Sequence, residues 1–304
     1  MASWVQRLGF GASALGGLFA EVDEETARAT VDRAWDLGVR SFDTAPLYGS
    51  GLSERRLGAA LRDRPREQFV LSTKVGRLLR PGKPDRAFVG APPLAPVFDY
   101  SRDGVLRSLE ESFDRLGLDH VDLALVHDPE ADIEAGLSAL QALREAGPRV
   151  GVGTNFVETA ITFIERGGVD AVLIAGRLTL LDRSAEERLL GLAQEYGVEL
   201  IVGGVYNSGI LAGGTTFDYA DAPAAVAARV RELDRACSHY GVPLAAAAIQ
   251  FPLQHDATSR IVVGARNAAE VTRNAELLAV DVPAALWDEL RSLEDARVRH
   301  PRTH

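Results

Sequence analysis

Residues 69–74 read Phe-Val-Leu-Ser-Thr-Lys, a short apolar run that ends in a lysine. The run lies between residues 53–61 and 101–116, two stretches in which apolar side chains recur every three or four residues, as in an amphipathic helix. A continuous apolar run in this setting is typical of a strand in a parallel sheet that helices cover on the outside. The stretch therefore predicts one strand–helix unit of an α/β fold.

The same unit recurs along the chain. Apolar runs predict eight strands, at residues 8–12, 40–44, 69–74, 121–126, 150–154, 171–175, 199–202 and 260–263. Helical patterns cover residues 23–37, 53–61, 101–116, 133–146, 157–166, 184–196, 224–240 continuing into 243–254, 267–278 and 283–294. Residues 76–99, which contain five prolines, are expected to form a long loop.

Eight strand–helix units favour a closed (β/α)8 barrel that forms a single domain over residues 1–304, with a loose tail from about residue 295. A doubly wound sheet is the alternative. Its phosphate-binding fingerprint, G-x-G-x-x-G after the first strand, is missing, because Gly9-Phe10-Gly11 is followed by Ala14. The sequence therefore favours the barrel.

Composition limits the partners. Lys and Arg total 33 and Asp and Glu total 43, which gives a net charge of −10. Because a polyphosphate backbone requires a positive surface, neither nucleic acid nor an anionic membrane is an expected partner. The single cysteine, Cys237, excludes an intramolecular disulfide, and no cluster of ligands predicts a metal site. Without an apolar segment of transmembrane length, we expect a cytoplasmic protein; its oligomeric state stays open.

Polar residues stand where successive predicted strands end. Asp43 ends the second strand, Lys74 the third, His127 the fourth and Asn155 the fifth, and Tyr48 follows Asp43 on the loop after the same strand. Each alone has a structural explanation, such as a turn cap for Asp43 or a satisfied polar residue for His127. In a (β/α)8 barrel, however, function lies at the C-terminal ends of the strands, so we expect these five residues to converge.

Their chemistry fits proton and hydride transfer. A lysine behind an apolar strand needs an anion, which Asp43 on the neighbouring strand can supply. Because a positive charge lowers a phenolic pKa from about 10, we expect Lys74 to bring the pKa of Tyr48 toward working pH. Tyr48 can then exchange a proton with a substrate oxygen that His127 orients. The constellation suits hydride transfer between a carbinol carbon and a cofactor.

These residues lie in motifs that resemble the aldo-keto reductase family. In family order the motifs are residues 42–49 (FDTAPLYG), 53–58 (SERRLG), 72–74 (STK), 108–117 (SLEESFDRLG), 121–127 (VDLALVH) and 151–155 (GVGTN). The resemblance implies a TIM barrel that binds NAD or NADP without a Rossmann domain. It also implies that Tyr48 is the general acid/base, that Lys74 and Asp43 tune it, and that His127 places the substrate oxygen.

Other motifs indicate a branch of the family. Residues 98–101 (FDYS), 127–129 (HDP), 175–177 (AGR) and 207–211 (NSGIL) resemble the branch that contains D-threo-aldose 1-dehydrogenase (L-fucose dehydrogenase) and pyridoxal 4-dehydrogenase. Its reactions convert cyclic hemiacetals to lactones, which implies oxidation of an aldose such as L-fucose at C1, or of pyridoxal as the alternative. The sequence also allows a general aldehyde or ketone reductase, or a non-catalytic nicotinamide-binding regulatory subunit. Expected substrate contacts are Phe19, Leu47, Tyr48, His127, Asp128 and the loop of residues 76–99.

The resemblance also implies a cofactor site. Asn155 is expected at the carboxamide. The loop after the seventh strand supplies Tyr206, Asn207, Ser208, Gly209 and Leu211, and the turn and helix after the eighth supply Gly264, Arg266, Glu270 and Asn274. The partial positive charge of the helix that begins near Asn267 suits the pyrophosphate.

Four positions depart from the family pattern. Leu173 replaces a glutamine, and Gly203 replaces the aromatic residue that stacks on nicotinamide, so that stacking comes from Tyr206 or is absent. Gly264 replaces a lysine that reads the 2′-phosphate of NADP, and Glu270 replaces an arginine. A carboxylate near the ribose favours NAD, whereas Arg266 can pair with a 2′-phosphate. The sequence favours NAD between the two.

Overall fold

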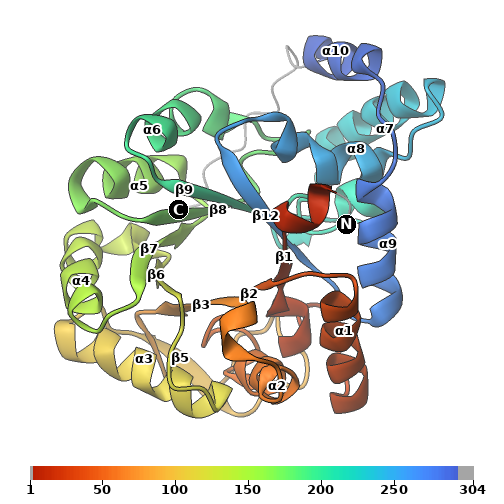
Figure 1. The fold of residues 1–304 in the computed structure, drawn as a ribbon. Helices are drawn as coiled ribbons and strands as arrows, with labels where there is room; N and C mark the ends of the chain where they lie inside the picture. The colour runs from red at the N-terminus through yellow and green to blue at the C-terminus, as the bar shows by residue number, and fades with distance from the viewer. Residues whose placement is uncertain (1–2, 294–304) are drawn as a thin grey trace.

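A computed structural model, which describes residues 3–293, shows a closed barrel of parallel strands inside a ring of helices (Figure 1). Around the barrel the strands are β1 (Leu8–Gly11), β2 (Ser41–Asp43), β3 (Val70–Val75), β6 (Leu123–His127), β7 (Arg149–Thr154), β8 (Ala171–Ala175), β9 (Glu199–Gly203) and β12 (Thr258–Gly264). Parallel pairing of β12 with β1 closes the ring. The predicted (β/α)8 barrel is confirmed; the tail expected from about residue 295 lies outside the described residues.

The helices follow the predicted order. They are α1 (Glu24–Asp36), α2 (Leu52–Leu61), α3 (Arg102–Leu116), α4 (Ile133–Glu145), α5 (Val157–Thr162), α6 (Leu189–Glu195), α7 (Ala224–His239), α8 (Leu244–Gln250), α9 (Ala268–Leu278) and α10 (Ala284–Ser292). Side chains of Asp23, Ser101, Asp132 and Asn267 cap α1, α3, α4 and α9 by accepting a backbone N–H three residues ahead. The helix expected from residue 184 begins later, because residues 184–186 form a 3-10 turn.

The prediction that residues 76–99 form a long loop is partly wrong. It contains an antiparallel hairpin of β4 (Arg77–Pro81) and β5 (Leu94–Phe98), in which Arg77 pairs with Phe98. Prolines are tolerated here because each strand of a two-stranded sheet has a free edge. The chain between β4 and β5 bonds to the loop after β1, where the Phe19 N–H donates to Ala87 O at 2.9 Å. A second, smaller hairpin after β9 joins β10 (Thr216–Phe217) to β11 (Ala220–Asp221).

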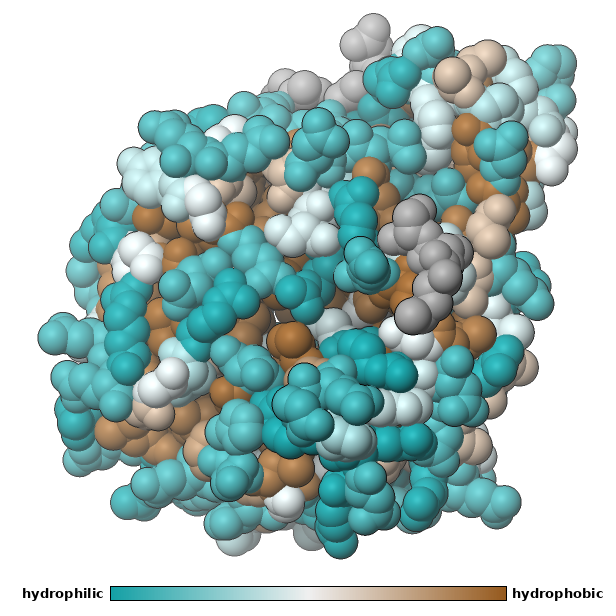
Figure 2. Space-filling view, in the orientation of Figure 1, coloured by the Kyte–Doolittle hydropathy of each residue, from teal (hydrophilic) through white to brown (hydrophobic). Residues whose placement is uncertain are grey.

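Apolar side chains form two clusters in the interior of the protein. A small apolar cluster occupies the middle, formed by Leu123, Leu125, Ala171, Leu173 and Ile201. A larger apolar core lies between the strands and the helices. Outside, hydrophilic residues cover most of the face seen in Figure 2, and hydrophobic residues show between them. Within residues 3–293, no helix combines the length and the apolar character needed to span a membrane.

Candidate active site

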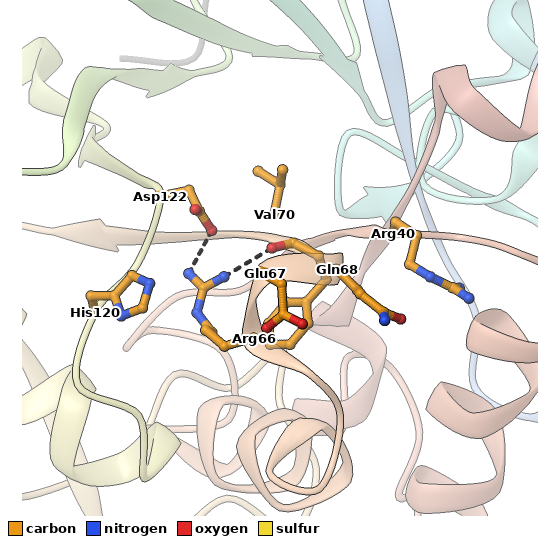
Figure 3. Close-up of a pocket in the computed structure, with 8 residues that line it drawn as sticks. Arg40, Arg66, Glu67, Gln68, Val70, His120 and Asp122 are labelled. Carbon is orange, nitrogen blue, oxygen red and sulfur yellow. Dashed lines mark hydrogen bonds and ion pairs between the residues drawn. The ribbon is translucent and has the colours of Figure 1, made fainter.

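Two cavities lie at opposite ends of the barrel. One, of about 430 Å³, lies where β2, β3 and β6 begin (Figure 3). Its arginines are already bonded: Arg66 pairs with Asp122 at 2.6 Å and donates to Phe69 O at 2.8 Å, and Arg40 donates to backbone carbonyls. The other, of about 850 Å³, lies where the strands end and is lined by Asp43 and Tyr48. The second cavity is therefore the candidate active site.

A buried ion pair forms the base of this site. Lys74 Nζ lies 2.6 Å from Asp43 Oδ2 and donates to Thr44 O at 3.0 Å, and the Lys74 residue is only 1% exposed. Ser72 Oγ donates to the other oxygen of Asp43 at 2.8 Å. Both charges thus have partners, as a buried pair requires. Lys74 Nζ lies 4.6 Å from the ring centroid of Tyr48, which brings three of the predicted residues together.

A close approach of two glycines fixes the loop that carries Tyr48. Gly49, with φ of +60°, lies so close to the backbone of Gly16 that a Cβ on either residue would collide with the other loop. This approach locks the loop after β2, which carries Tyr48, against the loop after β1. Gly153 lies beside the stem of Lys74, where a Cβ would make an ordinary contact of 3.4 Å with Lys74 Cε.

The electrostatics correct one expectation. Burial raises the pKa of Tyr48 to about 12, and the charge of Lys74 only partly opposes this effect. The prediction that Lys74 brings this pKa toward working pH is therefore wrong: desolvation of the phenolate outweighs the nearby charge. Burial also acts to lower the pKa of Lys74, but Asp43 and Tyr48 outweigh burial and raise it above its ordinary value. Tyr48 is a protonated phenol and Lys74 a cation at neutral pH.

His127, at the end of β6, lies beside Tyr48. The two ring centroids are 6.0 Å apart and the rings are nearly perpendicular, at 89°. Burial lowers the pKa of His127 well below its ordinary value, and Arg77 and Lys74 lower it further, so the imidazole is neutral. The ring centroid of Phe88, from the chain between β4 and β5, also lies 6.0 Å from that of Tyr48. The expected contribution of residues 76–99 to this region thus includes Phe88.

Most residues predicted to bind the cofactor line the cavity: Asn155, Tyr206, Asn207, Ser208, Gly209, Gly264, Arg266, Glu270 and Asn274. Leu211 does not line it. That residue is 1% exposed in the apolar core, and its N–H donates to Tyr206 O, so the structure gives no support to its predicted contact. Among the predicted substrate residues, Phe19 and Tyr48 line the cavity, whereas Leu47, His127 and Asp128 lie outside its described lining.

The far wall of the cavity is formed by β12 and α9. Arg266 and Glu270 bind each other: Arg266 Nη2 lies 2.7 Å from Glu270 Oε1, and the Arg266 N–H donates to Glu270 Oε2 at 2.8 Å. The Tyr206 hydroxyl donates to Asn274 Oδ1 at 3.0 Å, which ties this ring to α9. The two groups that the sequence places in competition for the ribose therefore neutralise each other.

Sequence reasoning missed Tyr219 and Arg273, which line the cavity, and Arg177, which bonds to two residues of its lining. Tyr219, on the β10–β11 turn, lines it with its ring 6.4 Å from that of Phe19. Arg177 Nε donates to Asn155 O at 2.8 Å, and its Nη1 pairs with Asp218 at 3.1 Å. Arg273 lines the wall on α9 and makes no ion pair within the described part of the chain. Of these, only Arg177 could have been found from the sequence, because it lies just beyond the C-terminal end of the predicted strand 171–175.

Comparisons with known proteins agree with this geometry. The model of the aldo/keto reductase family matches residues 7–295. The chain is 42% identical to pyridoxal 4-dehydrogenase from Microbacterium luteolum, covering 95% of this chain and 94% of that protein. It is 38% identical to D-threo-aldose 1-dehydrogenase from a Pseudomonas species, covering 94% and 93%. The holo structure of an aldo-keto reductase from Bacillus halodurans superposes with a TM-score of 0.76 at 26% identity, covering 94% of this chain and 91% of that one. The predicted family is confirmed: the chain belongs to the aldo/keto reductase family and is an oxidoreductase.

Proposed function

We propose that this enzyme oxidises a cyclic hemiacetal to a lactone, with an aldose such as L-fucose as substrate at C1 and NAD as the preferred cofactor. The observation that carries the proposal is the buried Lys74–Asp43 pair beside Tyr48 at a cavity large enough for a cofactor and a sugar. The similarity to D-threo-aldose 1-dehydrogenase and pyridoxal 4-dehydrogenase supports the choice of reaction.

Members of this family use nicotinamide cofactors, and the cavity fits one. Its volume of about 850 Å³ lies within the range of roughly 300–1,000 Å³ that is usual for small-molecule sites. It extends from Tyr48 to α9, and Asn207 Oδ1 is buried there without a hydrogen-bond partner among residues 3–293. When bound, a nicotinamide cofactor accepts or supplies the hydride. Asn155, Asn207, Ser208 and the N-terminus of α9 would hold it.

The proton is handled by residues of this chain. In the proposed oxidation, Tyr48 takes the proton of the C1 hydroxyl, while the C1–H bond breaks and its electron pair leaves as hydride. Tyr48 must therefore be a phenolate before the step, having released its own proton to solvent. The ammonium of Lys74 stabilises this phenolate until it accepts the substrate proton, and Asp43 holds Lys74 in place. The neutral imidazole of His127 can donate a hydrogen bond to the same oxygen. The carbonyl of the lactone is the product.

The residues of α9 that line the cavity favour NAD over NADP. The Glu270 carboxylate lines the cavity and would repel a 2′-phosphate, while its ion pair with Arg266 occupies the guanidinium that could bind one. Arg273 lines the same wall, and its positive charge would instead favour the 2′-phosphate of NADP. A kcat/KM that favours NADP by more than about tenfold would overturn this part of the proposal.

Direct assays test the reaction. We expect lactone formation from L-fucose with NAD⁺, and a kcat/KM above that for reduction of aromatic aldehydes by NADH or NADPH. Tyr48→Phe is the control: it should abolish turnover and preserve cofactor binding, measured by quenching of protein fluorescence. If only aldehyde reduction occurs, the enzyme is a general carbonyl reductase. If turnover survives in Tyr48→Phe, the assignment of the general acid/base is wrong.

Pyridoxal is the second candidate substrate, and the 42% identity to pyridoxal 4-dehydrogenase favours it. A screen of aldoses and pyridoxal with both oxidised cofactors separates the two. A kcat/KM for pyridoxal above that of every aldose tested would assign the enzyme to pyridoxal oxidation.

A further inference from the structure

Asp128, the residue after His127, has an unusual backbone. Its φ of +47° lies in the left-handed region, which non-glycine residues seldom adopt. Two donors hold it there: the Tyr100 hydroxyl shares its one proton between His127 O at 2.6 Å and Asp128 O at 2.9 Å, and the Asp128 N–H donates to Gly153 O at 2.9 Å. Backbone strain that is held in this way concentrates at functional sites, so the position of the Asp128 carboxylate calls for an explanation.

The carboxylate is held next to His127 by an arginine of the unpredicted hairpin. Arg77, the first residue of β4, forms an ion pair with Asp128 Oδ2, and its guanidinium lies 4.8 Å from the ring centroid of Phe98. The Nε of Arg77 is buried without a hydrogen-bond partner among residues 3–293. Asp128 Oδ2 also lies 3.5 Å from His127 Nε2. Arg77 thus fixes one carboxylate oxygen beside the imidazole.

The distance to His127 leaves both groups available. An N–H···O hydrogen bond spans about 2.7–3.2 Å, so at 3.5 Å neither His127 Nε2 nor Asp128 satisfies the other. The Asp128 side chain is 29% exposed, and it lies next to His127, whose ring centroid is 6.0 Å from that of the cavity residue Tyr48. A carboxylate accepts hydrogen bonds only, so it binds a group that donates a proton. Among uncharged substrate groups, a hydroxyl does this and a carbonyl does not.

We propose that the Arg77–Asp128 pair binds a hydroxyl on the carbon next to the reacting carbon and thereby selects hydroxylated substrates. This inference rests on the proposed oxidation of a hemiacetal. The reacting hydroxyl gives its one proton to Tyr48 and cannot also donate to Asp128, so Asp128 takes its hydrogen bond from a second hydroxyl. On a vicinal diol the two oxygens lie side by side, as do His127 Nε2 and Asp128 Oδ2. Arg77 supplies a donor for the lone pairs of that second hydroxyl.

The test compares substrates with and without the hydroxyl. For the wild-type enzyme we expect a kcat/KM for L-fucose at least about 30-fold above that for 2-deoxy-L-fucose, because a site built for a hydroxyl rejects an analogue that lacks it. In Asp128→Asn the ratio should fall by about fivefold or more, mainly through loss of activity on L-fucose, because the neutral amide no longer pairs with Arg77 and accepts a weaker hydrogen bond than the carboxylate does. Arg77→Met should reduce the ratio in the same way, and it provides a second variant if Asp128→Asn fails to fold.

Asp122→Asn is a matched control. Asp122 pairs with Arg66 at the opposite end of the barrel, and its side chain is 33% exposed, close to the 29% of Asp128 (Figure 3). This variant should keep the full wild-type ratio. Equal losses on both sugars in Asp128→Asn, or a wild-type enzyme that does not distinguish them, would overturn the inference.

A second pair of substrates distinguishes a failure of the proposed hemiacetal oxidation from a failure of the hydroxyl site. If the wild-type enzyme oxidises neither sugar, reduction of glyceraldehyde and propanal by NADH and NADPH provides the same comparison, since only glyceraldehyde carries the neighbouring hydroxyl. The wild-type preference for glyceraldehyde and its loss in Asp128→Asn would uphold the hydroxyl site while the hemiacetal reaction falls. The same preference in both proteins would overturn the hydroxyl site as well.

Discussion

Tyr48 retains its proton to high pH, because burial raises its phenolic pKa to about 12. The profile of kcat/KM against pH reports groups of the free enzyme. Oxidation needs the phenolate, whose fraction grows about tenfold per pH unit below the pKa, so its kcat/KM should rise steadily between about pH 7 and pH 10. Reduction uses the protonated phenol and should stay flat across the same range. A plateau of the oxidation rate below about pH 9 would contradict this pKa.

The proposed preference for NAD rests on one charge, that of Glu270. Glu270→Gln removes the charge and keeps an amide oxygen that can accept the hydrogen bond of the Arg266 N–H. Arg266 and Arg273 are then free to meet a 2′-phosphate, and the ratio of kcat/KM for NADP to that for NAD should rise by at least about tenfold, or roughly 1.4 kcal/mol. Glu276→Gln, on the exposed side of the same helix, is the control and should leave the ratio unchanged. An unchanged ratio in Glu270→Gln would show that the carboxylate does not set the preference.

Among the elements, those with a continuous apolar pattern were predictable and those with mixed patterns were not. All eight barrel strands lie within two residues of their predicted bounds, since burial on both faces leaves an apolar run in the sequence. The hairpin of β4 and β5 leaves no such run, because it is half exposed and contains Pro81 and Pro96. The chain at its tip bonds to the loop after β1, a long-range contact that a local pattern cannot reveal.

The tip of this hairpin places Phe88 beside Tyr48. Residues 83–92 can be replaced by Asn-Gly, a two-residue turn, because the Gly82 N–H already donates to Pro93 O at 3.0 Å. The replacement removes Phe88 from Tyr48, so we expect kcat/KM to fall by about tenfold or more. The thermal midpoint should change by less than about 5 °C, since few buried apolar side chains are lost. Phe88→Ala should reproduce most of the kinetic loss; full activity in the shortened protein would exclude a role for the tip.

At the scale of the whole molecule, the predictable part of the site is the part that the barrel itself positions. Asp43, Lys74 and His127 could be named from the sequence because each lies at or within one residue of the end of a strand, and parallel strands bring their ends to one face. Arg77 and Tyr219 could not, because hairpins outside the barrel bring them to the site. The pKa of Tyr48 was mispredicted for a related reason: the depth of its burial is a property of the assembled fold.

The two ends of the barrel should therefore respond differently to mutation. At the N-terminal ends of the strands, Glu199 is an interior carboxylate that pairs with Arg260 and lies 2.9 Å from Arg149. Glu199→Gln leaves Arg260 without its anion, and we expect a loss of about 2–3 kcal/mol in the free energy of unfolding, measured in urea. This is below the roughly 3–5 kcal/mol of a fully buried pair because the Glu199 side chain is 13% exposed. Because Glu199 lies at the end of the barrel away from Tyr48, kcat/KM should stay within about twofold of wild type. A large loss of kcat/KM in protein that remains folded would show that the two ends are coupled.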